Sequence, residues 1–191
     1  MVKIPPNELR IHALTNRHVD YLNSFKSISN ELNDFLKNDA LDGQSIMISR
    51  TYLCFYKEHL VGFITLLGDT IEPKFVTKTD GINDYEYAKY PAIKIGRLAV
   101  DKEFSGRGVG LHMLKWAIGL VNQISKQIGC RYITVDSKQD SIRFYEREGF
   151  KIVKKQRNRD FPPMYLNMHA FCLKMKHIES LDHFHEGEPR E

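Results

Sequence analysis

Apolar positions in the first third of the chain follow two spacings, which predict strands in some segments and helices in others. Polarity alternates over residues 9–14, as in a half-buried strand. Apolar side chains then recur at steps of three and four residues over 17–40, which predicts two helices with a break at Ser27–Asn30. Residues 51–57 and 60–67 are rich in β-branched and aromatic side chains, so we expect an antiparallel hairpin that turns at Glu58-His59.

The rest of the chain continues the mixture of strands and helices after a long loop. This loop covers residues 69–90, and connections of that length inside a domain are often functional lids or substrate walls. After it, the pattern predicts strands over 92–100, 131–136, 150–155 and 168–175, and helices over 110–128 and 140–148. The expected fold class is therefore α/β, with a mixed sheet and flanking helices.

Composition is that of an ordinary soluble protein with one domain. The chain has 191 residues, of which 42% are hydrophobic, and we assign 1–177 to a single domain and 178–191 to an acidic tail. The longest nearly apolar stretch, 60–67, is far shorter than the roughly 20 residues of a membrane helix. The first residues do not resemble a signal peptide, so we expect a cytoplasmic protein with no membrane contact.

The residues that commonly bind metals are poorly placed to do so. Cys54, Cys130 and Cys172 are widely spaced and form no C-x-x-C pair, so they suit neither a disulfide framework nor a zinc site. His183 and His185 lie near acidic residues, but a flexible tail rarely preorganises ligands. We expect no metal.

The segment with the most distinctive chemistry is a glycine turn, Ser105-Gly106-Arg107-Gly108-Val109-Gly110, between a predicted strand and a predicted helix. Glycines let successive backbone N–H groups point into one concavity, and the helix N-terminus adds roughly half a positive charge. A pyrophosphate suits such a site. The turn lacks the Gly-Lys-Ser/Thr end of a Walker sequence, and its strand does not open a βαβ series as in a Rossmann fingerprint.

Three motifs together resemble the GCN5-related N-acetyltransferases, the GNAT superfamily. They are Gly96-Arg97-Leu98-Ala99-Val100, the glycine turn, and Phe144-Tyr145-Glu146-Arg147-Glu148-Gly149-Phe150, in the family's order and spacing. The resemblance covers roughly residues 9–175. It implies a mostly antiparallel sheet with a central splayed strand pair and flanking helices. It also implies an enzyme that transfers the acetyl group of acetyl-CoA to a primary amine by direct attack in a ternary complex.

The resemblance assigns residues to the binding of acetyl-CoA. The backbone at Leu98, Ala99 and Val100 would hydrogen-bond the pantetheine arm. The glycine turn would hold the pyrophosphate through Ser105, Gly106, Arg107, Gly108, Val109 and Gly110. Ser105 stands where the family usually has Gln or Arg, and Arg107 could add a charge to the phosphates. Ser141 is small enough to keep the coenzyme groove open, and Phe144 is expected in the core or as a wall for the pantetheine.

Tyr145 is the catalytic residue that the resemblance implies. Its hydroxyl would lie near the sulfur and protonate the leaving thiolate, and a phenol of pKa about 10 is reasonably matched to a thiol of about 8–9. The alternative is that Tyr145 only packs beside Ile142 and Phe150. Lys94 stands where lysine-acetylating members often carry a glutamate base. A base would then come from a water chain or from the 69–90 loop, which contains Glu72, Asp80, Asp84 and Glu86.

The sequence leaves several chemical classes of amine open as the acceptor of the acetyl group. An α-amino group, with a pKa of about 7.7–8.0, is partly neutral at pH 7, whereas lysine, at about 10.4, is not. The missing base therefore favours an α-amine or another weakly basic acceptor. Residues 25–40 and the sequence Gly-Arg-Leu-Ala-Val-Asp also resemble a branch of the superfamily that includes toxins acetylating the α-amine of aminoacyl-tRNA.

A basic run in the last third of the chain bears on the same question. Lys151, Lys154, Lys155, Arg157 and Arg159 would contact RNA phosphates with such an acceptor, or otherwise decorate a solvated strand and loop. Candidate partners are a small-molecule, peptide or aminoacyl-tRNA amine, RNA, and a second copy of the chain as a homodimer. A catalytically inactive CoA-sensing or RNA-binding module is the contrasting class of function. The intact tyrosine and glycine turn argue against it.

Overall fold

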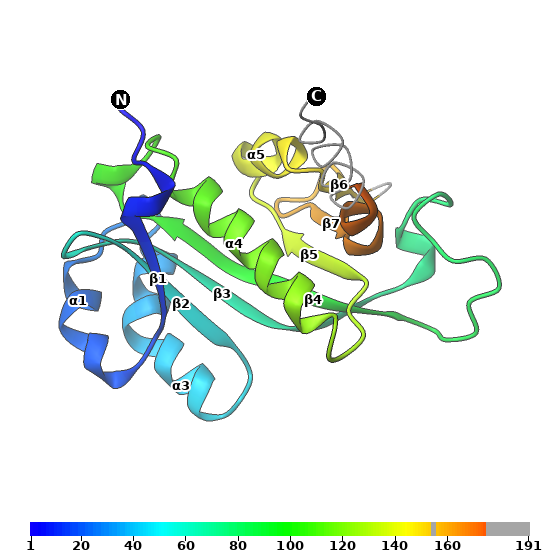
Figure 1. The fold of residues 1–191 in the computed structure, drawn as a ribbon, viewed down its shortest axis with the longest axis horizontal. Coiled ribbons are helices and arrows are strands. Elements are labelled where there is room, and N and C mark those ends of the chain that lie inside the picture. Colours follow the sequence, from blue (N-terminus) through cyan, green and yellow to red (C-terminus); the bar gives the residue numbers. More distant parts are fainter. Residues whose placement is uncertain (154–155, 175–191) are drawn as a thin grey trace, which may run out of the picture. The chain divides into compact units, whose positions relative to one another are not determined.

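A computed structural model describes residues 1–153 and 156–174 of the chain. Its strands are β1 Leu9–Ala13, β2 Arg50–Tyr56, β3 His59–Ile71, β4 Tyr90–Val100, β5 Tyr132–Asp136, β6 Lys151–Ile152 and β7 Pro163–Asn167. They form one seven-stranded sheet in the order β1-β2-β3-β4-β5-β7-β6 (Figure 1). The pairs β1/β2, β2/β3, β5/β7 and β6/β7 are antiparallel. The α/β fold class is therefore confirmed, and the splayed strand pair stays a prediction.

The helices are α1 Val19–Ser24, α2 Asn30–Asp34, α3 Ala40–Ser45, α4 Val109–Ile124 and α5 Ile142–Arg147, with a π-helical segment at Phe35–Asp39. Short 3-10 turns are η1 Pro6–Glu8, η2 Asn16–His18, η4 Pro73–Phe75, η5 Lys102–Phe104 and η6 Gln139–Ser141. The chain forms two compact units, one of residues 1–69 and 93–121, and one of 70–92 with the described part of 122–174. The assignment of 1–177 to a single domain stays a prediction.

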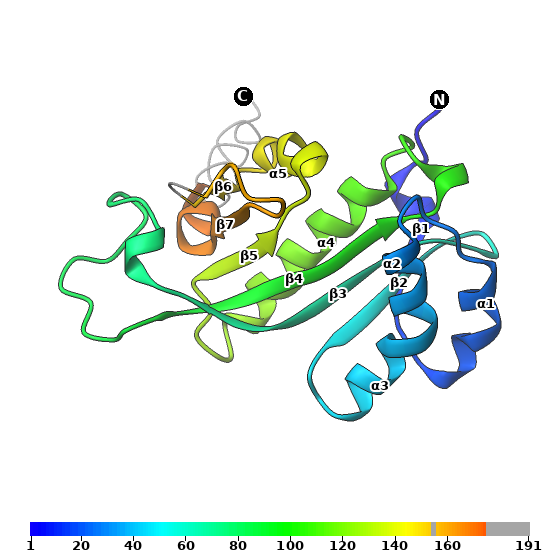
Figure 2. The same cartoon turned by 180° about the vertical axis from the view of Figure 1, so that it is seen from behind.

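The first unit has a hydrophobic core on each side of its strands. Leu53 and Phe55 of β2 pack with Phe25 and Leu36 in the cluster that holds α1–α3, whereas Cys54 packs with the cluster around α4. This is the alternation of a strand that is covered on both faces. Figure 2 shows α1–α3 together on one side of β1–β3.

The predicted hairpin is confirmed, with three local differences, the first of which is that β3 continues to Ile71, past the expected end at residue 67. The turn lies at Lys57-Glu58, one residue earlier than expected, and Lys57 takes a positive φ of 53°. Cys54 pairs with Gly62 and Phe55 with Leu60, which leaves Val61 as an extra residue in β3. A bulge of this kind bends the strand and turns two successive side chains toward one face.

The predicted helical break at 27–30 is also confirmed. The side chain of Asn33 accepts hydrogen bonds from the Ser27 amide at 2.7 Å and from the Ser27 hydroxyl at 2.9 Å, which stabilises the turn before α2. The helical segment then continues to Ser45, past the predicted end at 40, through the π-helical segment. In contrast, α4 ends at Ile124 instead of 128, and Ile128 is 68% exposed instead of continuing the buried stripe of the helix.

The expected strand over 168–175 is wrong. The strand β7 runs from Pro163 to Asn167, and residues 168–174 are helical. Proline is tolerated as the first residue of a strand, so Pro163 begins β7 instead of belonging to the loop. The Asn167 side chain then accepts a hydrogen bond from the Ala170 amide at 3.2 Å, which caps the helix that follows.

Candidate active site

The predicted pyrophosphate site is a turn before α4 in which two glycines have a positive φ. Gly106 has φ 73° and Gly108 has φ 90°, a conformation that other residues rarely adopt. A Cβ at Gly108 would meet no atom within 4 Å, so the space at this position is open. The first N–H groups of α4, a helix of 16 residues, have no acceptor within the helix and face this turn. The turn thus combines backbone donors with open space, which suits a pyrophosphate.

The N-terminal residues hold this turn in place. The buried Ile4 donates its amide to the Arg107 carbonyl at 3.0 Å. Arg107 Nε donates to the Val2 carbonyl at 3.3 Å, and its guanidinium lies 5.7 Å from the ring of Tyr56 and 5.3 Å from that of Phe104. The guanidinium is therefore directed at the N-terminal segment, and a contact with phosphate stays a prediction.

The strand segment predicted to hold the pantetheine lies just before this turn. Leu98 and Val100 are half-buried in the cluster of Val109 and Met113, while Ala99 is buried in the cluster on the α1–α3 side. These contacts fix the side chains on both faces of β4. Hydrogen bonding of the backbone to a donor molecule stays a prediction.

Tyr145 lies in α5 with its ring buried. The residue is 5% exposed, and its ring makes edge contacts with Phe144, 5.0 Å between centroids, and Phe150, 5.4 Å. The helix ends at Arg147, and the φ of 90° at Gly149 then lets the Phe150 amide donate to the Tyr145 carbonyl at 3.2 Å. Ser141, half-buried, is the residue before α5. The ring thus packs against Phe150 as the alternative reading expects, and the catalytic role of the hydroxyl stays a prediction.

Burial also sets the protonation of Tyr145. It raises the pKa of this phenol well above its ordinary value of about 10, because the phenolate would lose its hydration. No hydrogen bond from elsewhere in 1–153 or 156–174 engages the hydroxyl. Tyr145 therefore stays protonated at neutral pH and can donate. It is a weaker acid than the sequence-based comparison with a thiol assumes, so it suits donation of a hydrogen bond to developing negative charge better than full ionisation.

The predicted site residues form two sets. Residues 98–100 and 105–110 lie together in the first unit, and Ser141, Phe144 and Tyr145 lie together in the second. Lys154 and Lys155 lie outside the residues that the structure describes, as do His183 and His185.

Asp80, one of the acids considered as a base, is a buried structural anchor. It is 5% exposed, and its Oδ2 accepts hydrogen bonds from Lys151 at 2.7 Å, Thr77 at 2.8 Å and Tyr165 at 3.0 Å. Burial alone would raise the pKa of this carboxyl, but these three hydrogen bonds and the Lys151 charge lower it below its usual value. A carboxylate held in this way has little capacity to accept a further proton. Of the basic run, Lys151 is thereby committed to the 69–90 loop.

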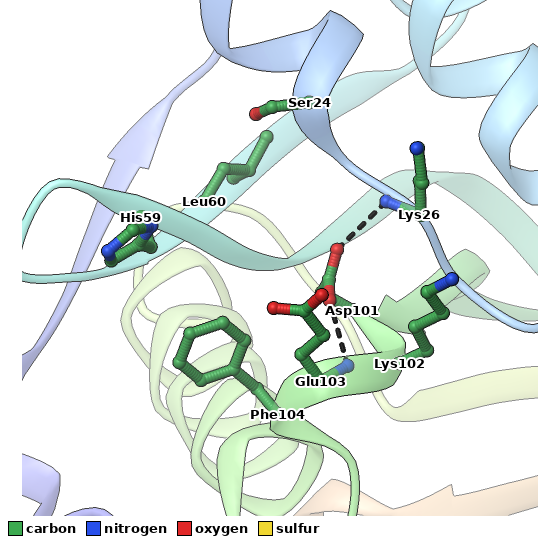
Figure 3. Close-up of a pocket in the computed structure, with 8 residues that line it drawn as sticks. All are labelled: Ser24, Lys26, His59, Leu60, Asp101, Lys102, Glu103 and Phe104. Carbon is green, nitrogen blue, oxygen red and sulfur yellow. Dashed lines mark hydrogen bonds between the residues drawn. The ribbon is translucent and has the colours of Figure 1, made fainter.

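Sequence analysis missed Asp101, which follows β4 directly. Its Oδ2 accepts a hydrogen bond from the Lys26 amide and its Oδ1 accepts one from the Glu103 amide (Figure 3). A cavity of about 160 Å³ lies beside it, with Lys26 and Lys102 on one side and His59 and Phe104 on the other in this view. The residues predicted to bind acetyl-CoA do not line this cavity. An aspartate before a turn is a common capping signal, which could have identified Asp101.

In the part of the chain that the structure describes, no helix is long and apolar enough to cross a membrane. Within the same residues, no three His, Cys, Asp or Glu side chains are grouped so as to hold a metal ion.

The family that matches this chain is described as "Acetyltransferase (GNAT) family", and the match covers residues 15–150. The chain belongs to this family. A tRNA-acetylating toxin of Mycobacterium tuberculosis (strain ATCC 25618 / H37Rv) is 32% identical over 134 residues, which make up 70% of this chain and 80% of that protein.

Solved structures of KacT and AtaT share the fold. A tyrosine-to-phenylalanine mutant of KacT superposes with a TM-score of 0.78 at 24% identity, over 87% of this chain and 98% of the other. AtaT complexed with acetyl-methionyl-tRNAfMet superposes with a TM-score of 0.77 at 22% identity, over 87% and 99%. At these identities the likeness establishes the fold.

As a GNAT enzyme, the protein is an N-acetyltransferase with acetyl-CoA as its donor. The open glycine turn at the N-terminus of α4 fits this donor, because it can accommodate the pyrophosphate of acetyl-CoA. Acetyl-CoA supplies a thioester whose acetyl group is transferred and whose thiolate leaves. The residues of this chain would bind its pyrophosphate and donate a hydrogen bond to the departing sulfur.

Proposed function

We propose that this N-acetyltransferase acetylates the α-amine of aminoacyl-tRNA, and that Tyr145 is its proton or hydrogen-bond donor. The observation that carries the proposal is the 32% identity with a tRNA-acetylating toxin over 70% of this chain. A general amine acetyltransferase is the competing function. The similarity to this toxin favours an aminoacyl-tRNA acceptor over a small amine.

The second unit supports an RNA acceptor through the position of its basic loop. Gln139 Nε2 donates to the carbonyls of Arg157 at 2.9 Å and Arg159 at 2.6 Å, so the loop is tied to the segment just before α5. Arg157 also lies 3.9 Å from Glu146, the neighbour of Tyr145, with 69% of its side chain exposed. Exposed guanidinium groups next to the catalytic helix are available for RNA phosphates.

Two of the four loop acids considered as a base are engaged elsewhere, which agrees with an α-amine. Asp80 is sequestered, and Glu72 forms an ion pair with Lys74 at 2.7 Å. An α-amine needs little assistance, because a substantial part of it is neutral near pH 7. A lysine acceptor would need a base to remove its proton before attack on the thioester.

The deciding experiment measures transfer from labelled acetyl-CoA to aminoacyl-tRNA, deacylated tRNA, free amino acids, peptides and polyamines. We expect rapid labelling of aminoacyl-tRNA and none of deacylated tRNA. A double variant Arg157→Glu, Arg159→Glu should label aminoacyl-tRNA more slowly, with a shallower salt dependence by roughly 0.7–0.9 per lost phosphate contact. The control, Lys126→Glu with Lys174→Glu, reverses two exposed charges elsewhere in the same unit. Labelling of small amines alone would establish the competing function.

A further inference from the structure

Arg97 has an unusual environment in β4. Its Nη1 donates to the Gly96 carbonyl at 2.9 Å, and its guanidinium carbon lies 5.1 Å from the centroid of the Phe35 ring. Its Nη2 approaches Glu31 at 3.8 Å. Its Nε is buried and has no hydrogen-bond partner, which is true of no other buried side-chain nitrogen or oxygen in 1–153 and 156–174.

Neither the Glu31 carboxylate nor the Phe35 ring provides a hydrogen-bond acceptor for the Arg97 Nε. The 3.8 Å distance to Glu31 exceeds a hydrogen bond, and the side chains are 40% exposed for Arg97 and 67% for Glu31. A buried donor without a partner is costly, so such a group in a folded protein calls for an explanation. One explanation is a ligand that completes the set of acceptors when it binds.

The helical segment that faces Arg97 is also irregular. Phe35 begins the π-helical segment Phe35–Asp39, and its amide donates to the carbonyls of Glu31 and Leu32. π-Helical turns are rare and occur frequently at functional sites. The Phe35 ring is stacked on Phe63, with 6.2 Å between centroids, and the same ring makes the cation–π contact with the Arg97 guanidinium.

The position of Arg97 along β4 separates it from the donor phosphates. Arg97 directly precedes the segment 98–100 but lies eight residues before the glycine turn that is predicted to bind the pyrophosphate. Its contacts with Glu31 and Phe35 place its side chain on the α1–α3 side, unlike those of Leu98 and Val100. An anion at Arg97 would therefore belong to the acceptor.

We propose that Arg97 binds a phosphate of the acceptor end of aminoacyl-tRNA, and that Glu31 occupies this guanidinium when no RNA is bound. This inference rests on the proposed function. Arginine offers a planar set of donors that matches phosphate geometry. Binding moves the exposed Glu31 side chain aside and gives Arg97 a closer, charge-assisted partner.

The test uses the opposite effects expected for the two partners. Arg97→Gln should raise KM for aminoacyl-tRNA by about tenfold, the order of one charge-assisted contact, and leave acetyl-CoA affinity unchanged. Glu31→Gln should lower that KM, because it removes the competitor for Arg97. Glu58→Gln, an exposed acid of the same unit, controls for the loss of a negative charge. If Glu31 and Arg97 only support the fold, both substitutions act in the same direction and the inference is overturned.

An acceptor without phosphate separates the possible sources of the anion. Aminoacyl-adenosine has no phosphate, so Arg97→Gln and wild type should acetylate it with equal KM. A larger KM for the variant with this acceptor would overturn the assignment to phosphate. The same result with a free amino acid would assign the acceptor's carboxylate to Arg97 instead.

Binding of deacylated tRNA, measured by filter retention, tests the inference without acetylation. Arg97→Gln should bind about tenfold more weakly than wild type, and Glu31→Gln more tightly, with unchanged thermal unfolding in both. If this holds while aminoacyl-tRNA is not acetylated, the proposed function fails and the phosphate site stands. Equal binding by wild type and Arg97→Gln, or no binding by wild type, overturns the phosphate site.

Discussion

The Lys26 amide donates a hydrogen bond of 2.8 Å to the carboxylate of Asp101, across 75 positions of sequence. The Glu103 amide donates to the other carboxylate oxygen of Asp101 at 2.9 Å (Figure 3). In addition, the Lys102 amide donates to the Lys26 carbonyl at 2.9 Å. These hydrogen bonds connect the segment between α1 and α2 to the segment that leads into the glycine turn. They link the side of the first unit that carries Arg97 with the residues that are predicted to bind the donor.

Replacement of Asp101 by Ala should lower both the stability of the first unit and its affinity for acetyl-CoA. Two amides would lose their acceptor, at a cost of about 2–3 kcal/mol in the free energy of unfolding, and acetyl-CoA should bind more weakly. Asp101→Asn keeps one acceptor oxygen and should have a smaller effect. Urea unfolding and calorimetry measure the two quantities. Glu103→Ala removes a neighbouring carboxylate but keeps the backbone amide, and equal losses in this control would contradict the role of Asp101.

A side chain at Gly108 should block the donor without disturbing a neighbour. Gly108→Ala costs roughly 1–2 kcal/mol because alanine is strained at φ 90°. Gly108→Glu adds negative charge at the N-terminus of α4 and should weaken acetyl-CoA binding by at least about tenfold, or about 1.4 kcal/mol. Calorimetric titration tests this, with Gly129→Glu at an exposed, open position as control. Unchanged affinity in Gly108→Glu would remove the pyrophosphate from this turn.

Removal of the Tyr145 hydroxyl should affect turnover but not packing. Tyr145→Phe keeps the edge contacts with Phe144 and Phe150, so thermal unfolding should be unchanged. We expect kcat to fall by about 10²-fold with little change in KM for acetyl-CoA. Turnover close to that of wild type would leave Tyr145 with a packing role alone.

The pH dependence of turnover provides a separate check on the same residue. In the proposed role of Tyr145, the protonated phenol is the active form, and its contribution to turnover is lost only as pH rises through its folded pKa. That pKa lies above the ordinary value of about 10, because of burial. The kcat of wild type should therefore show no decline from this group below about pH 10. A decline that Tyr145→Phe abolishes at lower pH would show that the hydroxyl ionises in the functional range.

Asp80 should make the stability of the second unit sensitive to acid. Its folded pKa is depressed below the unfolded value of about 3.9, so its stabilisation is complete above that pH and is lost as pH falls through the folded pKa. Asp80→Asn should be less stable than wild type by about 2 kcal/mol at pH 7, with a smaller difference below about pH 4. Unfolding followed by circular dichroism measures this. A difference that does not change with pH would mean that the charge of Asp80 is unimportant.

Regular elements were predictable from sequence because each has an apolar pattern that the fold buries. The hairpin of β2 and β3, the break at 27–30 and the stripe of α4 all follow local rules. The glycine turn was predictable for a different local reason, because positive φ restricts which residues are tolerated. The helix at 168–174 was missed because its cap, Asn167, lies inside an apolar segment that also fits a strand.

Residues that act through distant partners were not predictable. Asp80 meets Lys151 and Tyr165 across more than 70 positions, and nothing in the local sequence distinguishes it from Asp84 in the same loop. Arg97 was noted only as part of a motif, because the buried Nε and the Phe35 contact depend on tertiary packing. The roles of such residues become visible only in the folded structure.

The contact between Ile4 and Arg107 has a consequence for how this protein is produced and assayed. Met1 is 96% exposed, yet a Cβ at Gly106 would lie 3.9 Å from its sulfur, so the first residue is close to the glycine turn. An affinity tag joined directly to Met1 would begin at the entrance to the predicted donor site. It could compete with acetyl-CoA or pull Ile4 away from Arg107. Kinetic constants from such a fusion would then describe the tag as much as the enzyme, and a cleavable tag behind a long Gly/Ser linker would avoid this.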